Sequence, residues 1–268
     1  MLDSEIRQLA DEDYYHAQKL LLTTATTVGE VVEGRDLFIV STGVPLGAFN
    51  IGVAKPDGDE VGEAIAGIER YFGSRDLPYR IQLRDDQVKA FEPQFLEAGY
   101  AAVQPTPAMV LRKMPEIQTE VPGLTVEEIS AGDVGGIAAF RSVVEEGFGM
   151  PQGMGVAAIS DRVVAHADTA LFLGREGGAP VSTALLSMTN RVAGIYMVST
   201  AEAYRKRGFG AALTWACVHE GARRGARFAS LQASLMGRPV YERMGFETLS
   251  TYHMYASPGS DPSGGFGG

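Results

Sequence analysis

The chain has 268 residues, of which 45% are hydrophobic and 21% charged. This length suits two domains of about 100–150 residues each, with enough apolar residues to bury real cores. The formal net charge of −10 argues against a general affinity for nucleic acid or for anionic membranes, because both favour surfaces rich in Lys and Arg. The single cysteine, Cys217, excludes an intramolecular disulfide and any multi-cysteine metal site, and we expect no metal.

The first residues, MLDSE, lack the basic and apolar regions of a signal peptide. No run of about 18 apolar residues occurs either. We therefore expect a cytoplasmic protein without a membrane partner. Cys217 lies in a helical pattern beside Trp215 and Val218, so we expect it to be a small buried hydrophobe and not a nucleophile.

Hydrophobic periodicity and turn residues predict short strands alternating with helices in the first part of the chain. The predicted helices are residues 1–25, 60–72 and 87–98, and the predicted strands are residues 37–40, 48–53, 80–83 and 109–112. The stretch 113–123 is polar, contains two prolines and has no periodicity. It is the best candidate for a domain boundary.

After this boundary the pattern restarts with a strand and continues in the same alternating manner. The predicted helices are residues 133–147, 151–165, 208–224 and 239–244, and the predicted strands are residues 124–129, 170–174, 181–189, 192–200, 228–233 and 248–255. Asp133 is placed to cap the first of these helices. Residues 257–268 are rich in Gly, Ser and Pro and are expected to be disordered.

The loop between residues 200 and 211 has the features of an anion-binding site. It reads Arg205-Lys206-Arg207-Gly208-Phe209-Gly210, after a predicted strand and at the start of a long predicted helix. Glycines let a ligand approach the backbone, and the unpaired N–H groups and dipole of the first helical turn favour an anion. The three basic side chains strengthen this attraction.

Other glycine loops fit this stretch less well. A nucleotide-triphosphatase loop needs Gly-Lys-Ser/Thr, whereas Gly210 is followed by two alanines. A dinucleotide-binding fingerprint needs a third small residue, where this chain has Leu213, and an acidic residue about 20 positions later, where it has Ser-Leu-Gln. A loop whose glycines serve only a tight turn remains open on the motif alone.

Two downstream stretches, LQAS at residues 231–234 and GRPVYERMGF at residues 237–246, follow the loop in order. Together the three stretches resemble the GNAT (GCN5-related N-acetyltransferase) family. In that family Arg/Gln-x-x-Gly-x-Gly/Ala opens the helix that binds the CoA pyrophosphate, and Tyr-x-x-x-Gly-Phe follows later. The resemblance covers about residues 124–255. It implies an α/β (α+β) fold with a mixed, mostly antiparallel central sheet flanked by helices.

The resemblance also implies acetyl-CoA as the cofactor and a set of contacts to it. The residues implied to bind it are Val198, Ser199, Thr200, Arg205, Lys206, Arg207, Gly208, Phe209, Gly210, Ala211 and Ser234. Val198 and Thr200 lie on the strand that pairs with the pantetheine arm, and backbone N–H groups from Lys206 to Ala211 hold the pyrophosphate. Ser234 stands where many members have Asn, which puts a polar side-chain contact there in doubt.

Tyr241 matches the tyrosine that in many GNAT members protonates the leaving CoA thiolate as a general acid. The alternative is an aromatic core residue whose hydroxyl bonds a backbone carbonyl. The implied reaction is direct attack of an amine on the thioester in a ternary complex. Backbone N–H groups such as that of Val198 stabilise the oxyanion.

The sequence identifies no general base. The strand core 193–200 contains no Asp or Glu, so Glu145, Glu146, His253 and a water-relayed exit of the proton all stay open. The loop 145–155, which is fairly apolar, is expected to line the acceptor site. This favours the primary amine of a small molecule over a polybasic peptide.

The N-terminal half resembles the C-terminal half and is interpreted as a degenerate repeat of it. A shift of about 146 residues places FLEAGY at residues 95–100 on YERMGF at residues 241–246, and Gly62 on Gly208. Acidic Asp59 and Glu60 then stand where the second half has Arg205 and Lys206, and carboxylates repel a pyrophosphate. Phe95 replaces Tyr241. The alternative is the weak self-similarity that any two α/β halves share.

We therefore expect two GNAT-like domains in tandem: a degenerate domain without a cofactor site at residues 1–115 and a catalytic domain at residues 116–256. The first half is expected to help shape the acceptor site or an oligomer surface, and a homodimer is compatible with this. Two functions compete. One is an N-acetyltransferase for a small amine, and the other is a non-catalytic acyl-CoA sensor or regulatory module.

Overall fold

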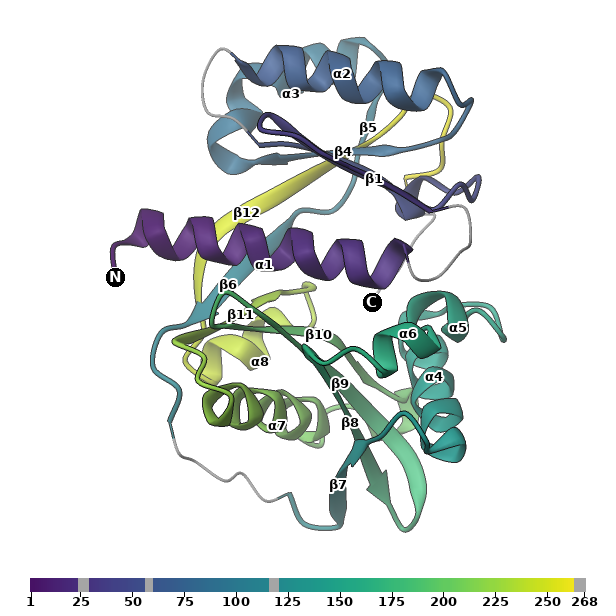
Figure 1. Cartoon of the computed structure of the whole chain (residues 1–268), viewed down its shortest axis with the longest axis vertical. Coiled ribbons are helices and arrows are strands. Elements are labelled where there is room, and N and C mark those ends of the chain that lie inside the picture. Colours follow the sequence, from purple (N-terminus) through teal and green to yellow (C-terminus); the bar gives the residue numbers. More distant parts are fainter. Residues whose placement is uncertain (24–28, 56–59, 116–120, 263–268) are drawn as a thin grey trace. The chain divides into compact units, whose positions relative to one another are not determined.

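The computed structural model describes residues 1–23, 29–55, 60–115 and 121–262 (Figure 1). Its contacts divide the chain into two compact units that are each discontinuous in sequence. Unit 1 comprises Met1–Ala17 and Ala108–Leu249, and unit 2 comprises Gln18–Pro107 and Ser250–Gly267. These boundaries differ from the division into 1–115 and 116–256 expected from the sequence. The first helix and the last strand of each half account for the difference.

Unit 1 is built on a sheet with strand order β6-β11-β10-β9-β8-β7. Its strands are β6 (Thr106–Leu111), β7 (Leu124–Ile129), β8 (Thr169–Glu176), β9 (Ala179–Thr189), β10 (Val192–Thr200) and β11 (Phe228–Gln232). The pair β10–β11 is parallel, and the other neighbours in this order are antiparallel. The expectation of a mixed, mostly antiparallel sheet is confirmed.

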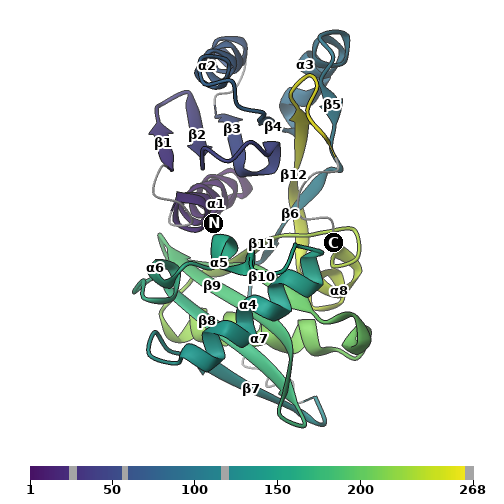
Figure 2. The ribbon, with the colours of Figure 1, turned by 90° about the vertical axis from the view of Figure 1, so that its right-hand side faces the viewer.

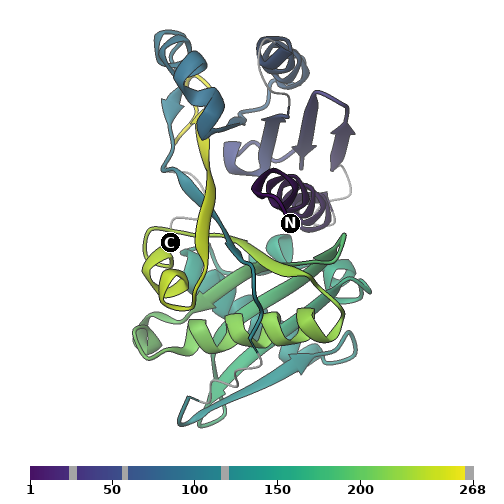
Figure 3. The same ribbon diagram turned by 90° about the vertical axis from the view of Figure 1, so that its left-hand side faces the viewer.

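Helices cover both faces of this sheet. The main ones are α4 (Val134–Phe148) and α7 (Phe209–Arg223), which lie on opposite faces of β8–β10 (Figure 1). Figure 3 shows α7 lying along the strands that it covers. Ile195, Leu213 and Val218 belong to the core between α7 and the sheet, and each is at most 2% exposed.

The start of α1 (Asp3–Thr23) covers the sheet face opposite α7. Ile6 and Ala10 pack there against Val192 of β10 and Phe228 of β11. The spacing of three or four residues places Ile6, Ala10 and Asp13 on one side of the helix. All three are buried. The helix predicted for residues 1–25 is therefore confirmed, and its part up to Ala17 belongs to unit 1.

The connection between β7 and β8 is partly as expected. Asp133 caps α4 by accepting a hydrogen bond from the Gly136 amide at 2.8 Å, which confirms the predicted cap. The single helix predicted for residues 151–165 is wrong, because two short helices occur there, α5 (Gly155–Ala158) and α6 (Asp161–Val164). Ser160 between them is extended and starts α6 by accepting from the Val163 amide at 3.3 Å.

Unit 2 has a sheet with strand order β1-β2-β3-β4-β12, and β5 also pairs with β12. Its elements are β1 (Glu30–Glu33), β2 (Leu37–Ser41), η1 (Gly47–Phe49), β3 (Asn50–Ala54), α2 (Val61–Gly73), β4 (Arg80–Arg84), α3 (Asp85–Glu97), β5 (Ala101–Ala102) and most of β12 (Glu247–Ala256). Figure 2 shows β1 to β4 side by side, with α2 along one face. Strand β1 was not predicted, and the strand expected from residue 48 begins at Asn50, after a turn of 3₁₀-helix.

The two units share one order of elements. The sequence β2-β3-α2-β4-α3 in unit 2 corresponds to β9-β10-α7-β11-α8 in unit 1, where α8 is Arg238–Arg243, and in both the two strands joined through the long helix are parallel. Both last helices end in the same way, with Gly99 at φ +84° and Gly245 at φ +92°. In both, the amide that follows the glycine donates to the carbonyl five residues earlier: Tyr100 to Phe95 and Phe246 to Tyr241, each at 2.9 Å.

The final strands of the two halves are exchanged between the units. Strand β6, from the first half of the chain, pairs with β11 in unit 1. Strand β12, from the end of the chain, pairs with β4 in unit 2. Each sheet is thus completed by a strand from the other half of the sequence, which explains why the units are discontinuous.

The C-terminal tail, which is expected to be disordered, makes contacts at its start. The Ser257 amide donates to the Tyr79 carbonyl at 2.9 Å, and the Tyr79 amide donates to Ser257 Oγ at 3.1 Å. Residues 263–268 lie outside the described part of the chain, as do Asp59 and residues 116–120 of the predicted boundary stretch. No helix in the described ranges is both long and apolar enough to span a bilayer.

Candidate active site

Strands β10 and β11 separate part-way along their length. Their parallel pairing runs from Val192–Phe228 to Ile195–Leu231 and ends there, although β10 continues to Thr200. Beyond Ile195 the two strands diverge, and β11 keeps pairing with β6 as far as Gln232. We call the opening between them the splay.

A β-bulge distorts β10 at the splay. The register with β9 shifts between Tyr196 and Ser199, so that the bulge removes Val198 from the ladder. Met197 adopts a left-handed conformation, φ +51°, which is uncommon for a residue with a side chain. Met197 and Val198 consequently lie outside the register that β10 forms with β9 and β11, at the edge of the splay.

Side chains of neighbouring elements hold the bulge in place. Thr183 Oγ1 donates to the Met197 carbonyl at 2.9 Å, and Ser182 Oγ donates to the Ser199 carbonyl at 2.7 Å. Ser199 Oγ in turn donates to the Val143 carbonyl of α4 at 2.9 Å. A Cβ atom at Gly147 would lie 1.7 Å from Ser199 Oγ, so α4 approaches β10 closely only because residue 147 is glycine. The Ser199 side chain is therefore a structural tie to α4.

The loop from Ala201 to Gly208 leads from β10 to the exposed start of α7. Gly208, at φ +86°, is the cap residue and supplies no side-chain hydrogen bond. The first bond within the helix runs from the Ala212 amide to the Gly208 carbonyl at 3.0 Å. The amides of Phe209, Gly210 and Ala211 therefore have no partner within the helix, as at any helix start. A Cβ on Gly210 would touch Val198 Cγ1 at 3.7 Å, so these amides lie beside the splay.

The basic residues of this loop have different environments. Arg205 donates to the Thr200 carbonyl at 3.2 Å and to the Gly147 carbonyl at 3.1 Å, which ties the loop to β10 and α4. Arg207 pairs with Glu176, with one contact at 2.8 Å. Lys206 is exposed, has φ +63°, and makes no ion pair with any residue that the structure describes. Lys206 is thus the loop cation left available for an anionic ligand.

Two of the residues implied to bind the cofactor are constrained by their own structural contacts. The Phe209 ring is 1% exposed, so only its backbone can reach a ligand. Ser234 is exposed, and its Oγ accepts a hydrogen bond from the Gly237 amide at 3.1 Å. This bond forms the turn into α8 and leaves the Ser234 hydroxyl proton free to donate.

Tyr241 lies on α8 and is 8% exposed. Its phenol hydrogen-bonds with Thr214 of α7. The pKa of Tyr241 is raised to about 12, chiefly by burial and to a small extent by the nearby Cys217, against the lowering effect of the Thr214 hydrogen bond. Tyr241 consequently holds its proton at neutral pH, as a general acid must. The environment of Tyr241 is therefore compatible with both roles expected from the sequence, a general acid and an aromatic core residue.

The carboxylates near the loop at residues 145–155 have structural roles. Glu145 Oε1 accepts from the Gly155 amide at 2.6 Å, and Glu146 Oε1 accepts from the Glu202 amide at 2.9 Å. His253 belongs to unit 2, where it pairs with Leu83. The loop side chains Phe148, Met150 and Met154 are all partly buried.

Sequence reasoning missed Asp13, which is fully buried on α1 and accepts a hydrogen bond from Tyr196 of β10 at 2.8 Å. The available signal was a carboxylate on the apolar side of a helix, in line with Ile6 and Ala10. Cys217, in contrast, is the expected buried thiol: it is 0% exposed, and burial raises its pKa well above the usual value.

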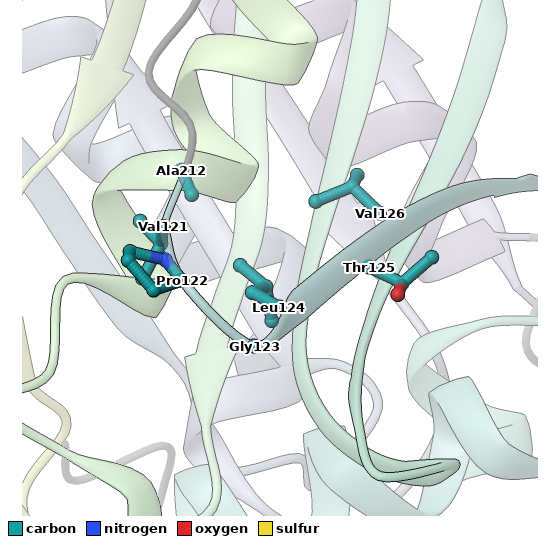
Figure 4. A pocket seen from close by; sticks show the side chains of 7 residues that line it. All are labelled: Val121, Pro122, Gly123, Leu124, Thr125, Val126 and Ala212. Carbon is teal, nitrogen blue, oxygen red and sulfur yellow. The ribbon is translucent and has the colours of Figure 1, made fainter.

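A cavity of about 530 Å³ lies beside α7 (Figure 4). Its lining consists of Val121, Pro122, Gly123, Leu124, Thr125, Val126 and Ala212. None of these side chains is titratable, so the cavity itself offers no acid or base. No grouping of three His, Cys, Asp or Glu side chains suited to a metal ion occurs in the described ranges.

The segment that contains the splay, the loop, α7 and α8 is also the part of the chain that matches a family model. Residues 147–246 match the model of the acetyltransferase (GNAT) family. This span carries a GNAT domain. The match covers less than half of the chain and leaves out α1 and β6, which complete unit 1 in the structure.

Solved structures show that the GNAT fold extends over almost the whole chain. A GCN5-related N-acetyltransferase from Kribbella flavida is 19% identical, with 92% of this chain and 96% of that chain covered at a TM-score of 0.65. One from Sphaerobacter thermophilus is 21% identical, with 84% and 78% covered and a TM-score of 0.64. A tandem GNAT protein from the clavulanic acid biosynthesis pathway is 10% identical, with 94% and 95% covered and a TM-score of 0.60.

At these identities the structural similarity shows the fold alone. No curated protein matches this sequence. The GNAT domain and the GNAT fold together support acyl transfer in general, and they name neither an acceptor nor a mechanism.

Proposed function

We propose that this protein is an N-acetyltransferase that moves an acetyl group from acetyl-CoA to the primary amine of a small molecule by direct attack in a ternary complex. The observation that carries the proposal is the juxtaposition of two features in the GNAT domain: the splay, with the bulge that contains Val198 at its edge, and the start of α7, whose cap residue Gly208 makes no side-chain hydrogen bond. The first feature suits a thioester arm, and the second suits a pyrophosphate.

The residues at the start of α7 fit the phosphate end of acetyl-CoA. The amides of Phe209, Gly210 and Ala211 would hold the pyrophosphate, with Lys206 adding positive charge. Gly208 and Gly210 keep the backbone accessible. Arg205 and Arg207 would act mainly by fixing the loop, since their guanidinium groups already bind Thr200, Gly147 and Glu176.

The residues along β10 fit the thioester end. The backbone of Val198, Ser199 and Thr200 would pair with the pantetheine arm, and the Val198 amide would stabilise negative charge on the thioester oxygen. Ser234 would donate from the other side of the splay. Acetyl-CoA supplies the activated acetyl group, and Tyr241 would return a proton to the departing sulfur.

The equivalent region of unit 2 lacks these features, which supports a degenerate first GNAT-like half. Strand β3 pairs with β2 from Asn50 to Ala54 without a register shift, so it has no bulge. Helix α2 approaches β3 so closely that a Cβ on Gly52 would lie 2.3 Å from Ile68 Cγ2. Acidic Glu60 occupies the cap of α2, and Phe95 stands in the place of Tyr241. One cofactor site per chain follows.

Calorimetry with acetyl-CoA, combined with release of free thiol over a panel of small amines, tests the proposal. We expect one acetyl-CoA per chain and thiol release with at least one amine. Gly208→Glu should abolish binding, because it places a carboxylate and a strained backbone at the anion site. Glu60→Lys, in the equivalent place of unit 2, is the matched control and should leave binding unchanged.

The same measurements separate the enzyme from the sensor. Binding of acetyl-CoA without thiol release from any amine would support a non-catalytic acyl-CoA module, and absence of binding would contradict both. Tyr241→Phe should lower turnover by about 10²-fold or more while affinity for acetyl-CoA stays within about twofold. Equal turnover of the variant and the wild type would remove Tyr241 as the acid.

A further inference from the structure

Asp13 is a buried carboxylate in a part of the molecule where apolar side chains are the rule. It follows Ile6 and Ala10 on the side of α1 that packs against β10 and β11, and its side chain is 0% exposed. Burying a charged group is costly unless its hydrogen bonds are fully satisfied. An alanine or leucine here would continue the apolar side of the helix.

The hydrogen bonds of Asp13 are all on one oxygen. Tyr196 Oη donates to Asp13 Oδ2 at 2.8 Å, and Ser230 Oγ donates to the same atom at 3.1 Å. Asp13 Oδ1 is buried and has no hydrogen-bond partner among the described residues. Half of the carboxylate is thus left unsatisfied, an arrangement that packing alone does not favour.

The surrounding backbone leaves space for this carboxylate. A Cβ on Gly194 would lie 2.1 Å from Asp13 Oδ2, so β10 admits the carboxylate only because residue 194 is glycine. Gly194 and Ser230 are direct partners in the parallel β10–β11 pair. The carboxylate therefore lies over the pair that precedes the last one, Ile195–Leu231, at the closed end of the splay.

Tyr196 connects this buried group to the splay. It is the last residue of β10 in register with β9 before the bulge, two positions from Val198. Its phenol also hydrogen-bonds with Gln232, the final residue of β11. A line of polar groups thus runs from Asp13 through Tyr196 to the point where β10 and β11 separate.

We propose that Asp13 is the final acceptor of the proton lost by the amine during acetyl transfer, and that Tyr196 relays it. This rests on the proposed N-acetyltransferase function. The N–H bond of the reacting nitrogen breaks and its proton passes to Tyr196 Oη, while the phenol proton passes to Asp13 Oδ2. An ammonium substrate loses two protons in all. One reaches Asp13 and later solvent, and the other replaces the proton that Tyr241 gives to sulfur.

The protonation states of the pair suit this step. Burial raises the pKa of Asp13 to about 7, and the bonds from Tyr196 and Ser230 lower it in part. Burial, followed by the charge of Asp13, raises the pKa of Tyr196 well above the usual value, so the phenol keeps its proton at rest. At slightly alkaline pH a carboxylate and a phenol stand together, ready to accept a proton at one end.

Other titratable groups lie on the elements that cover this face of the sheet, among them Asp11, whose charge acts on Tyr14. Tyr14, on the same helix, faces Tyr196 and contributes to raising its pKa. On α4, which covers the same sheet face, Arg141 binds the Ile159 carbonyl and Asp161, and Glu145 and Glu146 bind backbone amides. Ser187, opposite Gly194 on β9, is polar but not titratable in this range.

Four variants of the full chain, each assayed for acetyl-CoA binding and for kcat/KM against pH with the best amine of the panel, test the relay. Asp13→Asn keeps size and hydrogen bonding and should lower kcat/KM by about 10²- to 10⁴-fold, with affinity for acetyl-CoA within about twofold. The acid limb of the wild-type profile, near pH 7, should vanish. Glu12→Gln, a carboxylate control one position from Asp13 on α1 whose oxygens accept from Gln8 and Asn190, should keep the wild-type profile.

Tyr196→Phe and Ser230→Ala separate the relay from mere proximity. Each removes a hydrogen bond that lowers the pKa of Asp13, so in both the acid limb should move to higher pH. Only Tyr196→Phe should also lower the plateau at high pH, because Ser230 is not in the proton path. If circular dichroism shows that Asp13→Asn misfolds, the relay is still tested by whether Tyr196→Phe lowers the plateau at high pH and Ser230→Ala does not.

The results distinguish failure of the proton relay from failure of the proposed N-acetyltransferase function. An active wild type whose rate and acid limb survive in Asp13→Asn, or whose plateau survives in Tyr196→Phe, would overturn the relay and leave the acetyltransferase standing. A wild type that binds acetyl-CoA but acylates no amine would overturn both. Loss of acetyl-CoA binding in Asp13→Asn would make the residue structural and likewise overturn the relay.

Discussion

The buried position of Asp13 predicts an unusual dependence of stability on pH, which can be measured without any substrate. Replacing Asp13 by Asn removes the titrating group and keeps a side chain of the same shape. Since Tyr196 and Ser230 donate their hydrogen bonds, the Asn carbonyl oxygen can accept both. The variant should therefore fold and should differ from the wild type mainly in its response to pH.

The size of the effect follows from linkage between protonation and folding. The pKa of Asp13 rises from its ordinary 3.8 to about 7 in the folded chain. Between these values the folded state keeps a proton that the unfolded state has lost, so stability falls as pH rises. At about 1.4 kcal/mol for each pH unit, the wild type should lose roughly 4 kcal/mol between about pH 4 and pH 8. This contribution is fully present below the unfolded pKa and is lost through the folded one.

Urea denaturation of the wild type and Asp13→Asn, at intervals from about pH 4 to pH 8, measures this difference. Other groups titrate in both proteins and cancel in the comparison. The free energy of unfolding of the variant should gain on that of the wild type by several kcal/mol as pH rises. Two parallel curves would show that Asp13 is ionised or solvated in the folded chain, and the argument for a perturbed carboxylate would fail.

Three further predictions concern packing and organisation. Gly147→Ala should cost about 1–3 kcal/mol of stability by urea denaturation, since its Cβ meets Ser199 Oγ; Ser199→Ala should return part of this loss, and additive costs would refute the contact. Gly245→Ala should cost about 1–2 kcal/mol, because φ is +92° there, and Gly99→Ala, at φ +84°, should cost a similar amount. A fragment of residues 116–256 should not fold cooperatively by calorimetry, because it lacks β6 and α1; a sharp transition with intact acetyl-CoA binding would contradict the unit boundaries.

The local features of the fold could be predicted because they depend on neighbouring residues. The Asp133 cap, α7 and the strands of unit 1 follow from patterns within a few positions. Local patterns failed where they were weak. Strand β1 has only four residues, and its hydrogen bonds to β2 rather than its own sequence define it. The helix expected at residues 151–165 is divided at Ser160, whose side chain caps the second piece.

The candidate site likewise has features that the sequence predicts and features that it does not. The glycine loop and Tyr241 were recognisable because a motif has fixed spacing. Sequence could not show that Arg205 and Arg207 are engaged with Gly147 and Glu176, since those partners depend on the folded chain. The contact between Asp13 and Tyr196 joins residues 183 positions apart. No sequence pattern predicts a hydrogen bond between residues so far apart. The sequence does show a carboxylate on the apolar side of a predicted helix.

The exchange of final strands gives these long-range contacts a common origin. Once β6 completes the sheet of unit 1, the first half of the chain is bound to that unit at one edge. The same half supplies the start of α1, which covers Val192 and Phe228 and carries Asp13 to the closed end of the splay. A GNAT domain that ended at its family match would have neither the strand nor the carboxylate. The N-terminal half is thus required for unit 1 whatever its own half of the fold binds, because it supplies both β6 and Asp13.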